Sequence, residues 1–463
     1  MGKKFLSFLG ANNYTPSTYT LNILDKNDSK YAKYTQVVLL EKICNQWDES
    51  AKGFIFVTQE AKRVNWDGGD ENNQSLKREI EKLKEAGTIK FEIEAVEIPN
   101  GFSEQDIWKI FEIVVNHIDE EDEIVFDITH GYRYLPMLIV VMLSYLKTVK
   151  NINILGIYYG LFEVKDSNKP ILNFTPFIDL LDLSFGVSAF LHFGDGSYLE
   201  NTLLCKKDVR VKNEKQKLIQ SGLDIEIAEK KIEKMFTSNE WFKGINDLIS
   251  FAKSLRNFTD SIFTLRGRCT QNRDESIFAA YKDLREKIEK VQNLEADYFK
   301  PLKLMVEKIK QKTQKFENAD NLVIGEEVIK WCKEYSFIAE GYVALEETMI
   351  TYLCRVLGVD ENDSDVRKLV SAAATKKSKQ KNEQIETKNI YEVETKENEK
   401  IHEMVKSIPI EIAGFIERIK VKRNSVMHFG FTKDRIGSGR IINEFEELVE
   451  EALKLLSQTK NQV

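Results

Sequence analysis

Up to about residue 180, short β-rich apolar runs alternate with stretches whose apolar positions recur every three or four residues. The first pattern predicts buried strands and the second predicts amphipathic helices. Five strands are expected, over Phe5–Leu9, Gly53–Val57, Phe91–Ile98, Glu123–Ile128 and Ile152–Tyr159. Four helices are expected between them, over residues 33–47, 74–86, 103–118 and 135–149. Strands separated by helices need crossover connections, which favour a mostly parallel sheet covered on both faces.

This arrangement is a Rossmann-like α/β layout, and a hairpin is expected to close it. Two further β-rich segments, 161–164 and 171–174, flank the turn-forming residues Asp166–Lys169 and predict an antiparallel pair. The N-terminal domain is therefore expected to cover residues 1–190.

Beyond Gly194 the sequence becomes rich in Lys and Glu with helical periodicity. One apolar stripe predicts a single long helix and consists of Tyr281, Leu284, Ile288, Val291, Leu294 and Tyr298. Because the chain has only 7 prolines, few helices need be interrupted, and the C-terminal half is expected to be all-α. Residues 191–330 are expected to form a helical connector and residues 331–463 a second domain. Residues 375–400 contain hardly any apolar residue, so a mobile loop is expected there.

The composition is that of a soluble globular protein of two or three domains, with 463 residues, 42% hydrophobic and 30% charged. The formal net charge of −7 means that a polyanion must bind at a local site rather than to the whole surface. The 5 cysteines are isolated from one another, which favours a reducing cytoplasm. The longest apolar run, Leu135–Leu146, is shorter than the roughly 20 residues of a membrane helix, so no membrane contact is expected.

Two loops are expected at the carboxyl edge of the sheet, where open α/β folds bind ligands. If the first and fourth predicted strands are neighbours, the loops Gly10–Tyr14 and Asp127–Arg133 form one crevice. Glycine lets backbone amides approach, the following helix N-terminus favours anions, and Asn and Thr offer directional hydrogen bonds. These residue types suit a phosphorylated ligand that carries a base, with Arg133 holding a phosphate. The candidate ligand-binding residues are Gly10, Asn12, Asn13, Tyr14, Asp127, Thr129, His130, Gly131 and Arg133.

Two common nucleotide-binding motifs are missing. No G-x-G-x-x-G follows the first predicted strand, and no G-x-x-x-x-G-K-[ST] occurs in the chain. The sequence therefore argues against an NAD-dependent enzyme and against the commonest class of NTPase.

The segment Asp127–Gly131 reads D-I-T-H-G and resembles the D-x-T-H-G signature of CRISPR-associated proteins with a CARF domain. The strand and helix order over residues 1–180 and the Phe8–Tyr14 segment are also similar to that family. The resemblance implies a sensor that binds cyclic oligoadenylate, with tetra-adenylate favoured over hexa-adenylate, and a homodimer whose two sites merge around one ring. A structural alternative is that Asp127 and Thr129 cap the next helix while His130 packs in a turn.

Arg423 and His428 lie five residues apart in a helical region near the end of the chain. His428 suits general acid–base catalysis near neutral pH, and Arg423 suits the charge that builds on phosphate when RNA is cleaved. Asn424 shares a helix face with His428, whereas Arg423 does not quite share it, so two chains are expected to form a joint site. The structural alternative is a basic helix end in solvent, with Lys420 and Lys422 complementing the helix dipole.

The segment Arg423–His428 also resembles the R-x4-6-H motif of HEPN ribonucleases, which the same CRISPR family carries behind its CARF domain. The resemblance implies a HEPN domain over residues 331–463, with Arg423, Asn424 and His428 as catalytic residues and no metal or other cofactor. The expected function is cleavage of single-stranded RNA by a cytoplasmic, cyclic-oligoadenylate-activated endoribonuclease of type III CRISPR defence. A ligand-responsive transcription regulator and a non-catalytic HEPN scaffold are the alternatives. Slow cleavage of the activator by the sensor, at Thr129 and His130, stays open.

Overall fold

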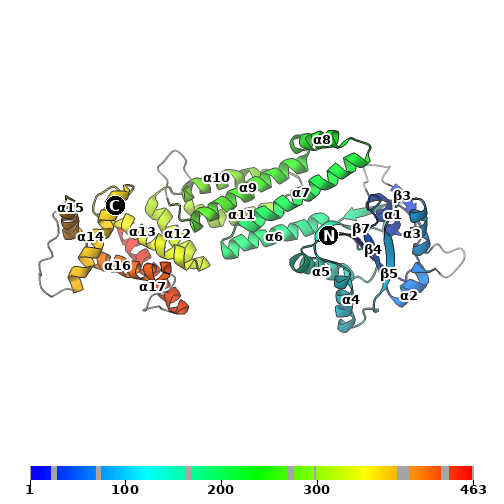
Figure 1. Ribbon diagram of the computed structural model, residues 1–463, viewed down its shortest axis with the longest axis horizontal. Helices are drawn as coiled ribbons and strands as arrows, with labels where there is room; N and C mark the ends of the chain where they lie inside the picture. Colours follow the sequence, from blue (N-terminus) through cyan, green and yellow to red (C-terminus); the bar gives the residue numbers. More distant parts are fainter. Residues whose placement is uncertain are drawn as a thin grey trace. The chain divides into compact units, whose positions relative to one another are not determined.

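The computed structural model describes residues 2–21, 29–68, 75–162, 164, 168–267, 276–296, 299–382, 396–428 and 437–460. They form two compact units, one up to Leu181 and one from Asp182 onwards, which are described separately. The first unit is α/β and the second is helical, as the sequence predicts (Figure 1).

The first unit is built on an eight-stranded, mostly parallel sheet in the order β3-β2-β8-β7-β6-β1-β4-β5. The strands are β1 (Lys3–Leu9), β2 (Ser17–Thr20), β3 (Ser29–Ala32), β4 (Lys52–Val57), β5 (Glu92–Glu97), β6 (Glu123–Asp127), β7 (Asn153–Gly160) and β8 (Asn168–Asn173). The five predicted strands are confirmed as β1, β4, β5, β6 and β7. Strand β1 pairs in parallel with β4 on one side and β6 on the other, so the first and fourth predicted strands are neighbours.

Two strands, β2 and β3, lie outside the prediction, whereas β8 confirms the β-rich segment predicted at 171–174. Strands β2 and β3 are only four residues long and mostly polar, so they lack the apolar run that marks the others. The predicted strand at 161–164 is wrong, because Leu161 and Phe162 follow β7 without strand structure. Strand β7 itself forms the antiparallel pair with β8, with Tyr158 opposite Asn173.

Helices cover both faces of the sheet. They are α1 (Thr35–Lys42), α2 (Gln59–Ala61), η2 (Lys62–Trp66), α3 (Leu76–Glu85), α4 (Glu104–Asn116) and α5 (Leu135–Lys150). One hydrophobic core packs α1 and α3 on one face, and a second packs α4 and α5 on the other. Side chains of β1 alternate between them: Phe5 and Leu9 belong to the first core, and Leu6 and Phe8 to the second. Strands β1, β4 and β6 are buried on both faces and largely apolar, which is why the sequence reveals them, whereas the edge strand β5 alternates Glu with apolar residues.

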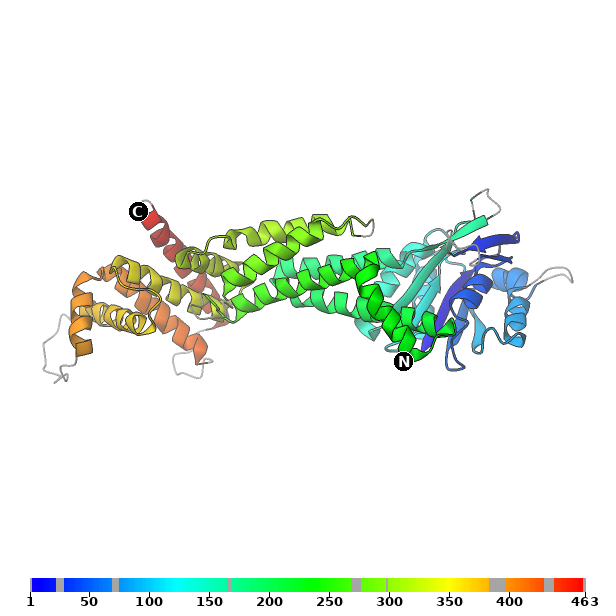
Figure 2. The same ribbon diagram turned by 90° about the horizontal axis from the view of Figure 1, so that it is seen from above.

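The second unit is helical, and α6 (Thr175–Phe193) runs into it from the first. Its other helices are α7 (Ser197–Gln220), α8 (Ile225–Ser238), α9 (Glu240–Phe263), α10 (Ile277–Gln292), α11 (Leu302–Thr313), η3 (Gln314–Phe316), α12 (Asn321–Tyr335), α13 (Ile338–Val356), α14 (Ser364–Asn382), α15 (Lys396–Ser407), α16 (Ile410–Met427) and α17 (Ser438–Lys460). The long helix α9 packs against both α7 and α10 (Figure 2).

The expected domain boundaries at 190 and 330 both fall inside helices, namely α6 and α12. The expected connector and C-terminal domain belong to one compact unit. The physical reason is a shared aromatic cluster, in which Trp331 contacts Phe190, Phe258 and Phe316 with ring centroids 5.8 to 5.9 Å apart. Side chains from well before and just after residue 330 thus share one core.

The predicted mobile loop over 375–400 is also corrected. Residues 375–382 continue α14, residues 396–400 begin α15, and residues 383–395 lie outside the described part of the chain. The polar segment is helical because α14 buries a narrow face of Val370, Ala373 and Ala374 while it packs against α16. The stripe predicted as one helix over 281–298 ends early, since α10 stops at Gln292 and Tyr298 is not described.

Among the described residues, α6 is the one helix long and apolar enough to cross a membrane by length and composition. The sequence does not single it out, because Asp179 and Asp182 interrupt its apolar run. One such helix is weak evidence for a membrane span, since a core helix of a water-soluble protein can be equally long and apolar. Asp182 pairs with Lys206 of α7 at 2.7 Å, which is a protein contact. The absence of membrane contact stays a prediction.

Candidate functional site

The carboxyl ends of β1 and β6 bring the two predicted crevice loops together. Ser7 of β1 lies opposite Asp127 of β6, so the loops that follow leave the sheet at the same edge. A Cβ atom added to Gly10 would lie 3.8 Å from the backbone nitrogen of Gly131, so the loops approach each other closely. Both loops therefore contribute to one site.

Asp127 is the centre of a buried polar network at this edge. Its side chain is 0% exposed and accepts hydrogen bonds from Ser7 Oγ at 3.0 Å, Thr35 Oγ1 at 3.3 Å and the Thr129 backbone N–H at 3.0 Å. The Thr129 hydroxyl also donates to Asp127 and accepts the Gly160 backbone N–H at 2.8 Å. Burial raises the pKa of Asp127, while these donors stabilise its carboxylate. The network ties together the ends of β1, β6 and β7 and the start of α1.

His130 is buried beside this network. Its side chain is 7% exposed, and Nε2 lies 3.3 Å from Thr35 Oγ1. The imidazole ring packs against the Tyr14 ring, with centroids 4.3 Å apart. Burial lowers the pKa of His130 to about 3, so the ring is neutral at physiological pH. His130 therefore supports the Tyr14 side of the crevice as an uncharged packing residue.

The structural alternative for the D-I-T-H-G segment is only half right. His130 does pack in a turn, but neither Asp127 nor Thr129 caps the following helix, because α5 begins after Tyr134 with no side-chain cap. Asp127, Thr129 and His130 are 0%, 6% and 7% exposed, so they hold the loops rather than present polar groups at the surface.

The Gly10–Tyr14 loop is held from two directions. Tyr14 folds back so that its hydroxyl accepts the Gly10 backbone N–H at 3.0 Å, and a Cβ on residue 10 would lie 2.6 Å from that hydroxyl. Asn65, buried in η2, donates from Nδ2 to the carbonyls of Gly10 and Asn12, both at 2.8 Å. Burial also raises the pKa of the Tyr14 phenol, so it stays protonated. The loop therefore has one defined shape before any ligand binds.

Four predicted ligand-binding residues face solvent: Asn12, Asn13, Gly131 and Arg133. Gly131 has a φ of +111°, a conformation that residues with side chains rarely adopt. Within the described residues, no hydrogen bond or ion pair engages the Arg133 guanidinium. The predicted set thus divides into buried residues that shape the crevice and exposed residues that can contact a ligand.

Two exposed aromatic rings extend this exposed set. Tyr132 is 42% exposed, and its ring stacks on Tyr134 with centroids 5.9 Å apart and planes 6° apart. Phe102, in the loop after β5, is 78% exposed and meets Tyr132 edge-on at 5.8 Å. Exposed rings of this kind are stacking surfaces for nucleic-acid bases.

The second predicted site lies where α13, α14 and α16 pack together. Helix α16 buries Ile412, Ile416 and Ile419, and Arg423 follows on the same face, which turns it towards α13. There Arg423 Nε donates to Glu346 Oε2 at 2.7 Å, and the Glu346 side chain is only 5% exposed. The Glu346 carboxylate raises the pKa of Arg423, so the guanidinium stays charged.

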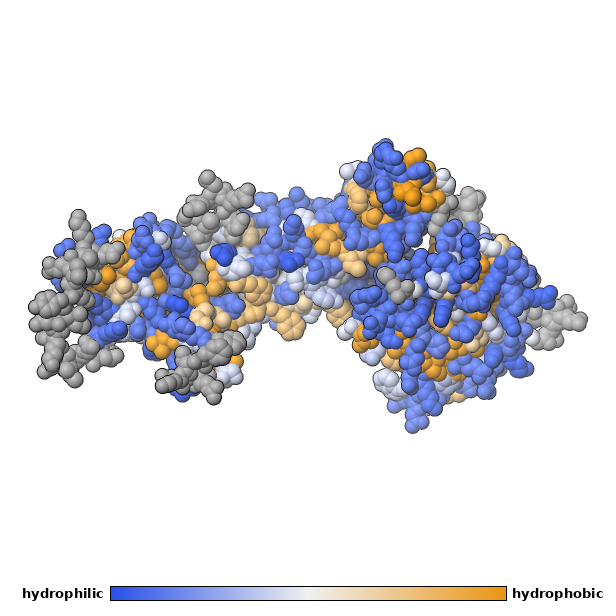
Figure 3. Space-filling view, in the orientation of Figure 1, coloured by the Kyte–Doolittle hydropathy of each residue, from blue (hydrophilic) through white to orange (hydrophobic). Residues whose placement is uncertain are grey.

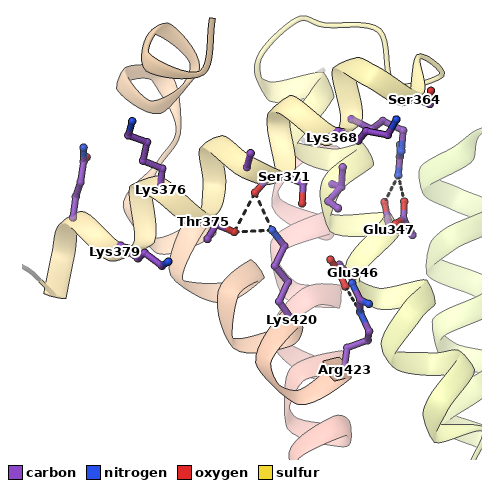
Figure 4. A pocket seen from close by; sticks show the side chains of 14 residues that line it. Glu346, Glu347, Ser364, Lys368, Ser371, Thr375, Lys376, Lys379, Lys420 and Arg423 are labelled. Atoms are coloured by element: carbon purple, nitrogen blue, oxygen red, sulfur yellow. Dashed lines mark hydrogen bonds and ion pairs between the residues drawn. The ribbon is translucent and has the colours of Figure 1, made fainter. Parts of the chain in front are cut away.

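An open cavity of about 1060 Å³ lies beside this pair, between the three helices. Figure 4 shows Lys420 reaching from α16 to α14, where its Nζ donates to Ser371 O and Thr375 Oγ1, both at 2.8 Å. Burial lowers the pKa of Lys420. Arg367 joins α14 to α13 through Glu347 Oε2 at 2.6 Å. The cavity is therefore polar and strongly hydrogen-bonded.

Asn424 and His428 do not line this cavity. Both are exposed, one helical turn apart, and the His428 backbone N–H donates to Asn424 O at 2.9 Å. At 100° per residue, His428 is rotated by about 140° from Arg423 around the axis of α16. One chain thus brings Arg423 to the cavity but leaves Asn424 and His428 on an adjoining face.

Residues 4–164 match the model of a family described as CRISPR system endoribonuclease Csx1, CARF domain. The matched range contains both crevice loops and all of the strands except β8. Residues 4–164 form a CARF domain. The family resemblance and the α/β fold predicted from the sequence are confirmed for this part of the chain.

The chain is also similar to CRISPR-associated protein MJ1674 of Methanocaldococcus jannaschii, with 25% identity over 266 residues. That match covers 56% of this chain and 34% of the relative, so it spans about a third of the relative's length. The chain therefore carries the ligand-sensing CARF domain of CRISPR-associated proteins. The HEPN assignment of its helical unit stays a prediction.

Several residues that organise the two sites could not be predicted from the sequence, or were recognisable only by a weak signal. In the CARF domain, Ser7 was detectable as a polar residue within a buried strand, whereas Thr35 and Asn65 lie on other elements and carry no such signal. In the helical unit, Glu346 precedes Arg423 by 77 residues, and only folding reveals their pairing.

In the part of the chain that the structure describes, no three His, Cys, Asp or Glu side chains are grouped as metal ligands. The expected metal independence of RNA cleavage stays a prediction, to be tested with a chelator.

Proposed function

We propose that this chain is a cytoplasmic, cyclic-oligoadenylate-activated endoribonuclease of type III CRISPR defence. CARF domains in general bind cyclic oligoadenylates. The crevice would hold the ring through Asn12, Asn13 and Arg133, with cyclic tetra-adenylate the favoured activator. His428 would transfer protons, Arg423 would stabilise the phosphate charge and Asn424 would orient the single-stranded RNA, without metal.

The observation that carries the proposal is the presence, behind a CARF domain, of an exposed histidine five residues after an arginine held by a buried carboxylate. The Glu346 contact fixes the Arg423 guanidinium and keeps it charged, which favours a role at a phosphate. A solvated basic helix end would not need such a contact. The ligand would activate cleavage only if it binds the active arrangement better than the resting one.

A fluorogenic single-stranded RNA, incubated with the purified chain and EDTA, tests the proposal directly. Cleavage is expected after addition of cyclic tetra-adenylate, more weakly with cyclic hexa- or tri-adenylate, and not without a ring. If a ring binds but no RNA is cut, the nuclease half is wrong. A salt-dependent shift of duplex DNA would then favour the alternative of a transcription regulator.

An exposed apolar stripe on the CARF domain supports a homodimer. Met137, Val141, Tyr145 and Val149 recur every four residues on α5 and are 72%, 58%, 45% and 46% exposed. Apolar surface is visible among the hydrophilic surface of this unit in Figure 3. A continuous apolar stripe is typical of an interaction surface, and a second copy would join two crevices around one ring.

Val141→Asp is therefore expected to convert the dimer to a monomer, because an unpaired carboxylate would be buried at the centre of the stripe. Multi-angle light scattering should show the mass falling by half, and ring affinity should fall with it. Leu304→Asp is the matched control, since Leu304 is 78% exposed on α11, outside the stripe. Dimers that persist in Val141→Asp would exclude α5 as the interface.

Tyr132→Ala is expected to weaken ring binding by roughly 5- to 150-fold, the equivalent of the ~1–3 kcal/mol that a stacked base contributes. Isothermal titration calorimetry with cyclic tetra-adenylate measures this effect. Tyr31→Ala serves as the control, because Tyr31 is a 69% exposed tyrosine on β3 that belongs to neither crevice loop. Equal affinities in the two variants would contradict a stacking role for Tyr132.

A further inference from the structure

The cavity next to Arg423 continues along one face of α14. Its lining residues Ser364, Lys368, Ser371, Thr375 and Lys379 recur every three or four residues, so they share that face. From Lys368 to Lys379 a helix rises about 16 Å. We call Lys368, Ser371, Thr375, Lys376 and Lys379 the α14 basic face.

The cavity is positively charged although the chain as a whole is acidic. Its lining includes six cationic side chains and two carboxylates, against a formal net charge of −7 for the chain. Both carboxylates are already engaged, Glu346 by Arg423 and Glu347 by Arg367. Lys420 donates its hydrogen bonds to uncharged oxygens of α14, while the carboxylates of Glu346 and Glu417 lie near enough to favour its charged form. Lys368 pairs with Asp365 at 2.9 Å, whereas Lys379 is exposed and forms no ion pair within the described residues, so the charge of Lys379 is available to an anionic ligand.

The lining also indicates the kind of anion. Only Ile350 and Ala372 among the 14 lining residues are apolar, and none is aromatic, so neither an apolar ligand nor a stacked base finds a surface there. Hydroxyl groups of Ser364 and Ser371 alternate with lysines, and such donors bind phosphate oxygens. The Thr375 hydroxyl already donates to Ser371 O at 3.2 Å. An elongated, positively charged cavity with hydroxyl donors fits a chain of phosphates better than one small anion.

We propose that the α14 basic face binds the phosphodiester backbone of single-stranded RNA and leads the strand to Arg423. The inference rests on the proposed ribonuclease function and deepens it. Because lysine contacts to phosphate carry no base information, this segment of RNA is bound without sequence preference. Lys379 is a positioning residue for the substrate and takes no part in bond cleavage.

Lys379→Gln tests the proposal against Lys377→Gln, a matched control on the same helix that does not line the cavity. Binding of a fluorescein-labelled, unstructured single-stranded RNA is measured by fluorescence anisotropy, with cyclic tetra-adenylate and EDTA, in a His428→Ala background. Loss of one phosphate contact should reduce the salt slope of log K by about 0.7. The affinity deficit of Lys379→Gln should therefore shrink by about 2.6-fold between 50 and 200 mM salt. Lys377→Gln should leave both affinity and slope unchanged.

A second readout separates this inference from the proposed function. In the cleavage assay with intact His428, Lys379→Gln should raise KM for RNA and leave kcat unchanged, because Lys379 does not touch the reacting atoms. Equal salt slopes in Lys379→Gln and Lys377→Gln, in a chain that cleaves RNA, would overturn the inference and leave the proposed function standing. Salt-dependent RNA binding through Lys379 in a chain that never cleaves RNA would support the binding face and refute the nuclease.

Discussion

His428→Ala is expected to reduce ring-activated RNA cleavage by about 10²- to 10⁴-fold, the usual contribution of a general acid or base. The substitution should leave the fold intact, because His428 is exposed and lies at the end of α16, outside the hydrophobic core. Single-turnover cleavage of a fluorogenic RNA at saturating cyclic tetra-adenylate measures the effect.

The controls for this prediction are ring affinity and thermal stability, both of which should match those of the unaltered chain. Full cleavage by His428→Ala would exclude this histidine from the reaction. A variant that loses ring binding as well would indicate misfolding rather than loss of a catalytic group.

The catalytic role of Arg423 cannot be tested by a single substitution. Arg423→Ala would leave the buried Glu346 carboxylate without its partner, at a cost of roughly 3 kcal/mol in the free energy of unfolding. An inactive Arg423→Ala chain could thus reflect either chemistry or instability. The double variant Arg423→Ala/Glu346→Gln removes both charges and isolates the catalytic contribution of the guanidinium.

Acidification is expected to destabilise the CARF domain through His130. The folded pKa of about 3 lies below the ordinary value of 6.5, so the folded state binds fewer protons than the unfolded state between these values. The contribution of neutral His130 to the free energy of unfolding is fully present above pH 6.5 and is lost as the pH falls towards 3. At 1.36 kcal/mol per pKa unit, the full loss is about 5 kcal/mol.

His130→Gln should flatten this dependence, because glutamine keeps a polar group near Thr35 but does not titrate. Urea unfolding of the full chain, followed by hydrogen exchange of β1 and β6 peptides over a pH series, measures the difference. The raised pKa of Asp127 acts in the opposite sense, since its contribution is lost as the pH rises above 3.8, and it is present in both chains. Identical pH profiles for the two chains would show that His130 is not held neutral by burial.

The sequence by itself determined those strands and helices of this protein whose apolar and polar positions follow a regular pattern. Strands β1, β4 and β6 are largely apolar because both of their faces are buried, and the edge strand β5 alternates Glu with apolar residues. These patterns allowed the strands, their helices and the edge that carries the crevice to be predicted. The D-I-T-H-G segment, together with the strand and helix order, was sufficient to predict the CARF domain. Short polar strands such as β2 and β3 escaped because their stability comes from pairing with β8 and with each other rather than from their own residues.

Only the tertiary structure decided how the site residues divide their tasks. Asp127, Thr129 and His130 read as ligand contacts in the sequence but are buried, because Ser7 and Thr35 from other elements close over them. The helical unit shows the same limit. Arg423 meets Glu346 because α16 packs on α13, and the α14 basic face lines the same cavity as Arg423 because α14 packs on α16 through Ala373 and Ala374. Periodicity along one segment reports which residues are buried, but contacts between distant segments depend on packing that no single segment encodes.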